Sequence, residues 1–433
     1  MEQPITADDI SRDLIHFIAK SPSTFHAVRG IKAALLYAGF TEIREEDTWQ
    51  IEKGGKYVVT RNGSALMAFT VPEEGAEAFH ITASHCDSPT FKIKENPEIA
   101  DGPYVKLNVE GYGGMIMSTW LDRPLSVAGR PLSVAGRLLV TENGHLTEKL
   151  VAIDGTMLII PSVAIHMDRN VNQHKEWKVQ KDMLPLYGMT GAKTPFMDVI
   201  AAAAKVKAED ILAHDLILYS RVPGTIWGEE REFISSPKLD DLQCAFACFR
   251  GFTQGQKEKY ISVYALFDNE EVGSATSQGA GSTFLANTLE RLARSLGYSY
   301  DETMAMIARS FMISADNAHS VHPNHPEYAD PVNRPVINGG IVIKYSAAQK
   351  YATNAFSAAY FKKLCKDHDI PTQTFTNHSD NPGGSTLGNI SNTVIAMPTV
   401  DIGLPQLAMH SSYETTGVKD TAYLVDAVTK FYE

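Results

Sequence analysis

Five short segments of the sequence bring together carboxylates and imidazoles, the side chains that bind divalent metals or move protons. They are "SHCDSP" with His85 and Asp87, "SPKLDDL" with Asp240 and Asp241, "FDNEEVGS" with Glu270 and Glu271, "ISADNAHSVHPN" with Asp316, His319 and His322, and "AMHSSYE" with His410. Ligands of α/β folds bind at the carboxyl ends of strands, which is where these segments are expected to fall. We therefore expect them to meet at one edge of a sheet.

Each segment also has a structural alternative when it is taken alone. His85 and Asp87 fit a solvated loop, and Asp240 fits the first turn of an apolar helix, where Asp is a common cap. The two glutamates fit a polar turn after a buried strand, and a lone His410 fits a structural role. Only the histidine-rich segment after "FMISA" favours metal binding or catalysis by itself.

The combination of segments favours a two-metal centre. Together they offer two histidines and three carboxylates as ligands, with one glutamate left over. Two divalent cations would be balanced by three carboxylates and a hydroxide, and the donor types suit zinc, manganese or cobalt alike. Such a centre beside a free carboxylate produces hydroxide near neutral pH and attacks a carbonyl. No GxSxG, Walker or HExxH motif competes with this interpretation.

The adjacent glutamates of "FDNEEVGS" can take different roles. Successive side chains at a strand end point in different directions, so one glutamate can face a metal and the other the water between two metals. Gly273 then lets the backbone turn away.

The elements that must position these residues form an α/β pattern. Helical periodicity covers roughly residues 8–19, with Thr6 as its cap, and 24–39, and a strand is expected at "AFHITAS". From about residue 235 helices and strands alternate, which predicts a mixed, largely parallel sheet with helices on both faces. From about residue 95 to 232 the sequence has a β-like pattern, with "YVKLNVE", "RLLVTE" and "TMLIIPSVAI" as expected strands. We expect a discontinuous α/β domain, residues 1–93 and 234–433, interrupted by a β-rich domain, residues 94–233.

Composition excludes several classes of function. The chain has 433 residues and a formal charge of −12, so it offers no basic surface for nucleic acid. No apolar run approaches the roughly 20 residues that span a bilayer. The four cysteines form no CxxC pair, so neither a disulfide framework nor a structural zinc cluster is expected, and Cys244 and Cys248 are expected to be small buried hydrophobes. The expected location is the cytoplasm.

One heptad, RPLSVAG, occurs twice in tandem, at Arg123–Gly129 and Arg130–Gly136. An odd-numbered insertion into a strand would swap its two faces, so one copy is expected to bulge or loop out. We assign it no function.

The ordered set of motifs resembles the aspartyl aminopeptidase family of dinuclear metallopeptidases. Besides the five segments, the resemblance includes "WLDRPLSVAGR", "IPSVAIHMDRN", "GGIVIKYSAAQKYATN" and "GGSTLGNIS", and it runs through nearly the whole chain. It implies a metallopeptidase-type α/β sheet interrupted by a β-rich dimerisation domain.

The resemblance also implies a role for each site residue. Asp240 would bridge the two metals, with His85 and Asp316 completing one site and Glu271 and His410 the other. Glu270 would be the general base that takes a proton from the bridging water and passes it to the leaving amine, and Asp87 would orient His85. Where many relatives have "LDN", this chain has Asp241, which adds a charge beside the bridging ligand.

Assembly and specificity are implied in the same way. The family forms a tetrahedral homododecamer built from dimers, in which His166 would reach a neighbour's active site and stabilise the oxyanion. Lys344 matches a lysine that receives an N-terminal Asp or Glu, while His319 and His322 would line the pocket or orient Asp316. Asp380 and Ser385 are candidates for another pocket wall. The expected substrates are peptides with an acidic N-terminus.

Two other functions remain compatible with the residues. A dinuclear deacylase or carboxypeptidase would use the same metal centre on other amides. A non-catalytic oligomeric scaffold would retain an idle site, although the full set of ligands together with Glu270 argues against it.

Overall fold

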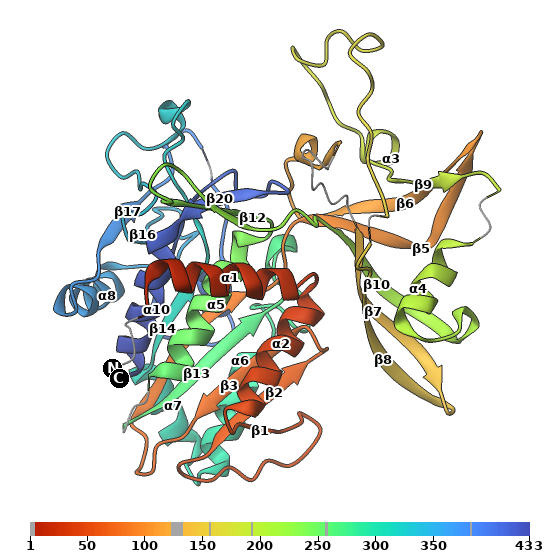
Figure 1. The fold of residues 1–433 in the computed structure, drawn as a ribbon. Coiled ribbons are helices and arrows are strands. Elements are labelled where there is room, and N and C mark those ends of the chain that lie inside the picture. The colour runs from red at the N-terminus through yellow and green to blue at the C-terminus, as the bar shows by residue number, and fades with distance from the viewer. Residues whose placement is uncertain (1–4, 123–132, 156, 192–193, 256–258, 382) are drawn as a thin grey trace.

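The computed structural model describes residues 5–122, 133–155, 157–191, 194–255, 259–381 and 383–433. The chain forms a large α/β unit and a smaller β-rich unit that projects from it (Figure 1).

A nine-stranded mixed sheet forms the centre of the large unit. Its strands, in spatial order, are β1 (Thr41–Glu42), β2 (Lys56–Arg61), β3 (Ala65–Thr70), β13 (Tyr260–Phe267), β4 (Ala78–His85), β14 (Phe311–Ala315), β18 (Thr399–Gly403), β16 (Ile341–Lys344) and β17 (Thr372–Phe375). The central strands β13, β4, β14 and β18 are parallel, so their carboxyl ends meet at one edge. Antiparallel neighbours lie on both sides of this group. The predicted α/β class is confirmed.

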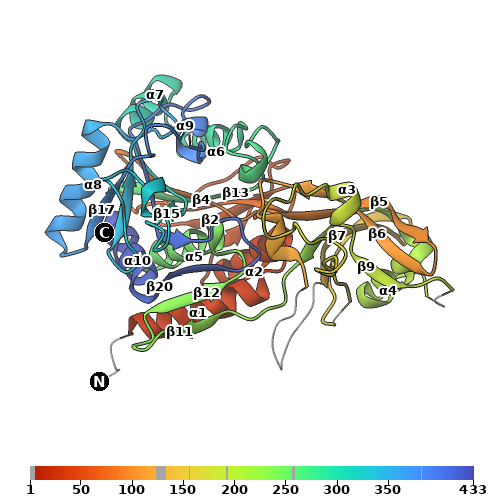
Figure 2. The ribbon, with the colours of Figure 1, turned by 90° about the horizontal axis from the view of Figure 1, so that it is seen from above.

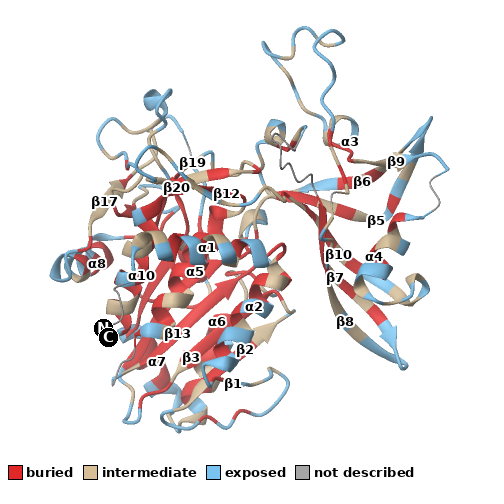
Figure 3. Cartoon of the chain, in the orientation of Figure 1, coloured by how far each residue is buried: buried red, intermediate tan, exposed pale blue. Residues whose placement is uncertain are grey.

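Helices cover both faces of this sheet (Figures 1 and 2). One face carries α1 (Ala7–Lys20), α2 (Thr24–Tyr37), α5 (Leu239–Gln254), α8 (Ala355–Asp367) and α10 (Val418–Tyr432), and the other carries α6 (Phe284–Ser295), α7 (Tyr300–Arg309) and α9 (Leu387–Ser391). Strand β3 shows the two-residue period behind this arrangement, because Leu66 and Ala68 pack into one core while Met67 and Phe69 pack into the other. The buried sheet between two helical layers is visible in Figure 3.

The β-rich unit is a six-stranded antiparallel sheet with its own core. Its strands, in spatial order, are β8 (His145–Ala152), β7 (Ser133–Glu142), β10 (Ile211–Tyr219), β5 (Thr90–Asp101), β6 (Tyr104–Tyr112) and β9 (Leu186–Met189), joined by the helices α3 (Val179–Asp182) and α4 (Phe196–Ala204) and by 3₁₀ turns at Met117–Trp120 and Ala208–Asp210. Phe91, Leu138 and Phe196 are fully buried in this core.

A third, five-stranded sheet joins the ends of distant segments. It contains β11 (Thr225–Trp227), β12 (Phe233–Ser236), β20 (Glu414–Gly417), β19 (Pro405–Leu407) and β15 (Ala318–His319). Two further 3₁₀ turns cover Glu270–Val272 and Pro326–Tyr328. Along the chain, the last strand of the six-stranded sheet, β10, ends at Tyr219, and the next two strands, β11 and β12, already belong to this small sheet.

One predicted strand is wrong. In "TMLIIPSVAI" the described residues form no strand but isolated bridges at Leu158 and Ile159, the second of them to Leu186. Leu158 and Ile160 are buried in the core, but Pro161 has no N–H to continue the ladder, and the chain then runs exposed through turns.

Three smaller expectations concern the cap of α1, the cysteines and the duplicated heptad. Thr6 caps α1, because its Oγ1 accepts the Asp9 amide N–H at 3.2 Å. All four cysteines are buried and free, which confirms the predicted burial of Cys244 and Cys248. Of the duplicated heptad, Ser133–Gly136 begins β7, while residues 123–132 lie outside the described residues, so the expected bulge is not tested.

Candidate metal centre and active site

Three ligand-bearing loops leave adjacent parallel strands of the large sheet. His85 is the last residue of β4, Asp316 directly follows β14, and Glu270 and Glu271 follow β13. Since β4 lies between β13 and β14, the sheet order alone brings these side chains to one edge. Asp240 and His410 arrive from the small sheet, after β12 and β19 respectively.

Asp240 lies between the two histidines. Its Oδ1 is 3.5 Å from His85 Nε2, and its Oδ2 is 3.3 Å from His410 Nε2. On the first side, His85 Nε2 is also 3.8 Å from Asp316 Oδ1, and on the second His410 Nε2 is 3.3 Å from Glu271 Oε2. The five predicted ligands therefore form two groups that share the carboxylate of Asp240.

The adjacent glutamates lie in a turn rather than at an extended strand end. Asn269 has a φ of 61°, and Glu270–Val272 forms a 3₁₀ turn that ends at Gly273, with a φ of 98°. The tight turn keeps both carboxylates close to His85, since one ligand atom from each of the three residues lies within 4.8 Å of the others.

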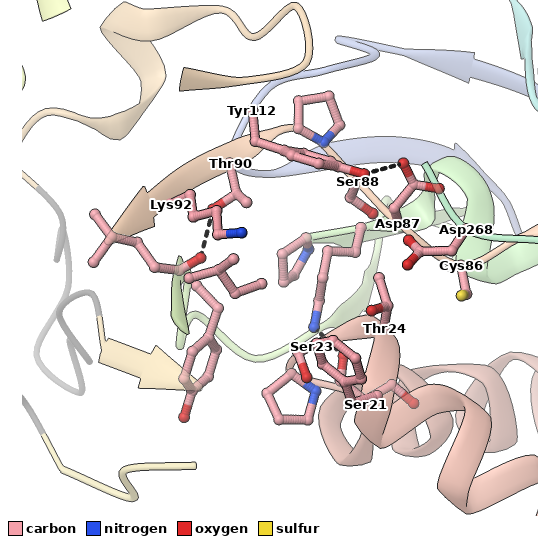
Figure 4. Close-up of a pocket in the computed structure, with 18 of the residues that line it drawn as sticks. Ser21, Ser23, Thr24, Cys86, Asp87, Ser88, Thr90, Lys92, Tyr112 and Asp268 are labelled. Carbon is pink, nitrogen blue, oxygen red and sulfur yellow. Dashed lines mark hydrogen bonds between the residues drawn. The ribbon is translucent and has the colours of Figure 1, made fainter. Parts of the chain in front are cut away.

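Asp87 is held by hydrogen bonds from several elements. Its two carboxylate oxygens accept the amide N–H groups of Glu270 and Glu271, each at 3.1 Å. The Tyr112 hydroxyl donates to Asp87 Oδ2 at 2.7 Å (Figure 4). His85 Nδ1 is 3.3 Å from Asp87 Oδ1. Asp87 therefore links the orientation of the His85 ring to the glutamate turn.

Asp240 and Asp241 do not cap helix α5. Lys238 occupies the N-cap position, and both aspartates have non-helical backbone angles with a cis peptide bond between them. Asp241 Oδ2 instead accepts the His85 amide N–H at 3.2 Å. Asp241 is fully buried, and one of its carboxylate oxygens lies within 4.8 Å of ligand atoms of His85, Asp240 and Asp316.

The donor set fits divalent cations. Asp240 Oδ1 and Glu271 Oε1 are buried and have no hydrogen-bond partner within the described chain. Burial raises the pKa of Glu270 to about 8, and burial followed by the Asp240 charge raises the pKa of Glu271. Burial lowers the pKa of His410, but Asp240 outweighs this and raises it to about 9. The raised pKa values of the two glutamates and of His410 indicate an excess of negative charge in this cluster, which metal ions would offset.

The cavity in front of this cluster contains part of the predicted substrate site. It has a volume of about 310 Å³, and its lining includes Glu270, Lys344, His319 and Ser385. Lys344, the last residue of β16, is buried, and its Nζ is 3.3 Å from Asp316 Oδ2. Burial lowers the pKa of His319.

Three residues that were predicted to contact the substrate or the oxyanion do not line this cavity. His322 is exposed and lines a neighbouring cavity of about 270 Å³ that shares His319 and Phe375 with the first. The Asp380 side chain is 93% exposed. His166 lies on an exposed loop of the β-rich unit.

Sequence reasoning missed residues that support the cluster. Glu414 accepts the amide N–H groups of Asp240 and His410, Tyr112 donates to Asp87, and the Gly114 carbonyl oxygen is 2.7 Å from His410 Nδ1. Glu414 ends the motif "AMHSSYE", which was the one available signal. Tyr112 and Gly114 belong to the β-rich unit, and no local pattern connects them to the ligands.

A family model described as "Aminopeptidase I zinc metalloprotease (M18)" matches residues 17–432. The chain belongs to this family. The predicted resemblance is confirmed, and the M18 chain is a metallo-aminopeptidase, which favours that function over the deacylase and scaffold alternatives.

Two relatives match this chain over nearly its whole length. Probable M18 family aminopeptidase 2 of Clostridium novyi is 46% identical over 429 residues, covering 98% of each chain. Aspartyl aminopeptidase 4 of Saccharomyces cerevisiae is 35% identical over 476 residues, covering 100% of this chain and 96% of the relative.

Two solved structures show the same fold. A chain in the cryo-EM structure of the Ape4 and Nbr1 complex has a TM-score of 0.94 and 33% identity, with 99% of this chain and 86% of that chain covered. The S. cerevisiae mApe1 dodecamer has a TM-score of 0.86 and 27% identity, with 98% and 96% covered. No helix within the described ranges of the M18 chain is long and apolar enough to cross a membrane.

Proposed function

We propose that this M18 aminopeptidase uses two divalent metal ions, zinc in the first place and manganese or cobalt as substitutes, to release N-terminal Asp or Glu from peptides. The position of Asp240 carries the proposal. Its two oxygens face different histidines, at 3.5 and 3.3 Å, as expected of a bridging carboxylate. His85 and Asp316 would complete one site, and Glu271 and His410 the other. When bound, such ions polarise a carbonyl and lower the pKa of the attacking water.

Glu270 is the proposed general base. It lines the cavity beside the ligand cluster but is not needed to complete either ligand group around Asp240. Its carboxylate would take a proton from the water and deliver it to the leaving amine, which requires one group that both accepts and donates. Asp87 would orient His85 and the glutamate turn through the four contacts described above.

Lys344 is the proposed receptor for the acidic side chain. Its ammonium is buried in the cavity, 3.3 Å from Asp316 and 5.6 Å from the centre of the Tyr351 ring. A buried ammonium beside a cavity attracts a carboxylate more strongly than an exposed one, because little water screens the interaction. His319 would line the same pocket, and His322 the adjoining one.

The specificity is tested with Lys344→Met and a panel of Asp-, Glu-, Ala- and Leu-p-nitroanilides. Loss of a charge-assisted hydrogen bond of about 1.5–3 kcal/mol predicts that the ratio of kcat/KM for Asp over Leu falls roughly 10- to 100-fold. The exposed Lys350→Met is the matched control. An unchanged ratio in Lys344→Met would contradict the role of Lys344, even if all rates fell because Asp316 lost its ion pair.

We further propose assembly into a homododecamer of dimers, with the β-rich unit, residues 94–233, as the dimerisation domain and residues 1–93 and 234–433 as the catalytic domain. The loop around His166 projects from the molecule (Figure 1) and exposes Val163 by 50%, Ile165 by 46% and Met167 by 82%. Exposed apolar groups beside a histidine suit insertion into a neighbouring subunit, where His166 would stabilise the oxyanion. The similar mApe1 structure is a dodecamer. Free, buried thiols suit the cytoplasm.

A further inference from the structure

Glu414 is a buried carboxylate that contacts the backbone of two residues of the ligand cluster. It is the first residue of β20 and is 2% exposed. Its Oε2 accepts the Asp240 amide N–H at 3.0 Å, and its Oε1 accepts the His410 amide N–H at 2.7 Å. Within the described residues no lysine or arginine forms an ion pair with Glu414, so these backbone groups are its principal partners.

The two residues that Glu414 holds come from distant parts of the chain. Asp240 precedes Glu414 by 174 residues, whereas His410 lies four residues before it, in a left-handed conformation with a φ of 66°. Neither backbone is part of a regular hydrogen-bonded ladder at these positions. A single carboxylate therefore fixes the spacing of two segments, the irregular start of α5 and the turn at His410, whose side chains approach to 3.3 Å.

From this geometry we infer that Glu414 is a positioning residue for the metal site formed by Asp240, Glu271 and His410. It acts on the ligands through their backbone and does not touch substrate or metal. The inference rests on the proposed two-metal function. It predicts that loss of Glu414 weakens metal binding more at one site than at the other. On the His410 side two of the three ligands, Asp240 and His410, depend on Glu414, whereas on the His85 side only Asp240 does.

A carboxylate is required because both of its oxygens accept an N–H. In Glu414→Gln the amide nitrogen would face one of the two N–H donors, which breaks one bond without changing the size of the side chain. Comparable losses around metal ligands cost 10- to 100-fold in metal affinity.

Asp420 offers a matched control. It is also fully buried, and it accepts the amide N–H groups of Asn338 at 2.7 Å and Gly340 at 3.2 Å, but no ligand of the cluster. Asp420→Asn and Glu414→Gln each remove a backbone hydrogen bond to a buried carboxylate, so both lower stability. Only Glu414→Gln should change metal binding selectively.

The test titrates the chelator-stripped full-length proteins with Co²⁺ and follows the visible absorption of the bound ion. Wild type and Asp420→Asn should show two binding steps with similar constants. Glu414→Gln should keep the first step and weaken the second 10- to 100-fold, and excess Co²⁺ should restore its aminopeptidase activity. Glu414→Asp keeps the charge but has a shorter side chain, so its Co²⁺ affinity in the second step should lie between those of wild type and Glu414→Gln. This variant provides the test if Glu414→Gln does not fold.

Two results would overturn the inference. One is that the Co²⁺ affinities of both binding steps fall by the same factor in the Glu414 variants. The other is that the variants fold and both affinities stay at the wild-type level. Wild-type protein that binds a single Co²⁺ would instead refute the two-metal proposal itself, and with it the site that Glu414 is inferred to position.

Discussion

Glu270 and Glu271 are neighbours in the sequence but have different surroundings. Glu271 Oε2 is 3.3 Å from His410 Nε2, and its Oε1 is buried without a hydrogen-bond partner in the described chain, as expected of a ligand atom. Glu270 instead faces the cavity, where burial raises its pKa to about 8. Metal ions nearby would lower that pKa, so the carboxylate would be ionised and able to accept a proton at neutral pH.

Glu270→Gln is expected to lower kcat by about 10²–10⁴-fold, because the amide cannot accept and return a proton. Zinc content should stay at the wild-type level, since the proposed ligands are unchanged. Steady-state kinetics and elemental analysis on the same sample measure both quantities. The exposed Glu327→Gln serves as the control. A Glu270→Gln enzyme that turns over at the wild-type rate would refute the assignment of the base.

At the scale of elements, some of the site could be predicted and some could not. The loops after β4, β13 and β14 were predictable because each follows a continuous apolar strand, and parallel neighbours share an edge. The small sheet was missed, since β15 and β19 are only two and three residues long and their partners lie far along the chain. Glu414, which begins β20, was missed with it.

The β-rich unit also contributes to the site in a way that sequence could not indicate. Gly113, with a φ of 73°, follows β6 and passes so close to Glu271 that an added Cβ would lie 3.1 Å from the Glu271 Cβ. The absence of a side chain lets Tyr112 and Gly114 on either side reach Asp87 and His410. Such contacts depend on the relative placement of two units, which leaves no local pattern.

Helix α2 carries a pH-dependent contribution to stability. Burial, with the charges of Arg29 and Lys238, lowers the pKa of His26 from 6.5 to about 4. The folded protein keeps His26 neutral where the unfolded chain binds a proton, so this contribution is complete above pH 6.5 and is lost as the pH falls towards 4.

His26→Gln should therefore reduce the loss of stability between pH 7 and pH 4.5 by about 1–3 kcal/mol relative to wild type. Urea unfolding at the two pH values measures the difference, and exposed His145→Gln provides the control for general effects of histidine removal. If wild type and His26→Gln lose the same stability on acidification, His26 does not titrate as described.

For the whole molecule, the proposed trans role of His166 can be separated from assembly. Subunits with Glu270→Gln lack a base but present an intact His166, and subunits with His166→Ala lack only the donor. Homo-oligomers of either variant should be nearly inactive, because one oxyanion donor is worth roughly 10²–10³ in rate. Co-expressed hybrids should regain activity, since some His166→Ala sites then receive a neighbour's histidine.

Light scattering on each preparation should give a mass of about twelve times the 47.5 kDa chain. That measurement shows that all samples are assembled alike. Hybrids that form but remain as inactive as their parents would contradict a donor supplied by a neighbouring subunit.

The span of the site along the chain has a consequence for biosynthesis. His410 Nδ1 contacts the carbonyl of Gly114, 296 residues earlier, and α10 packs against α5, which begins with the Asp240 segment. A ribosome releases residues in order, so a nascent chain holds His85, Asp240 and Glu270 long before His410 and β20 are made. Peptide hydrolysis should begin only after the C-terminal segment has emerged and docked.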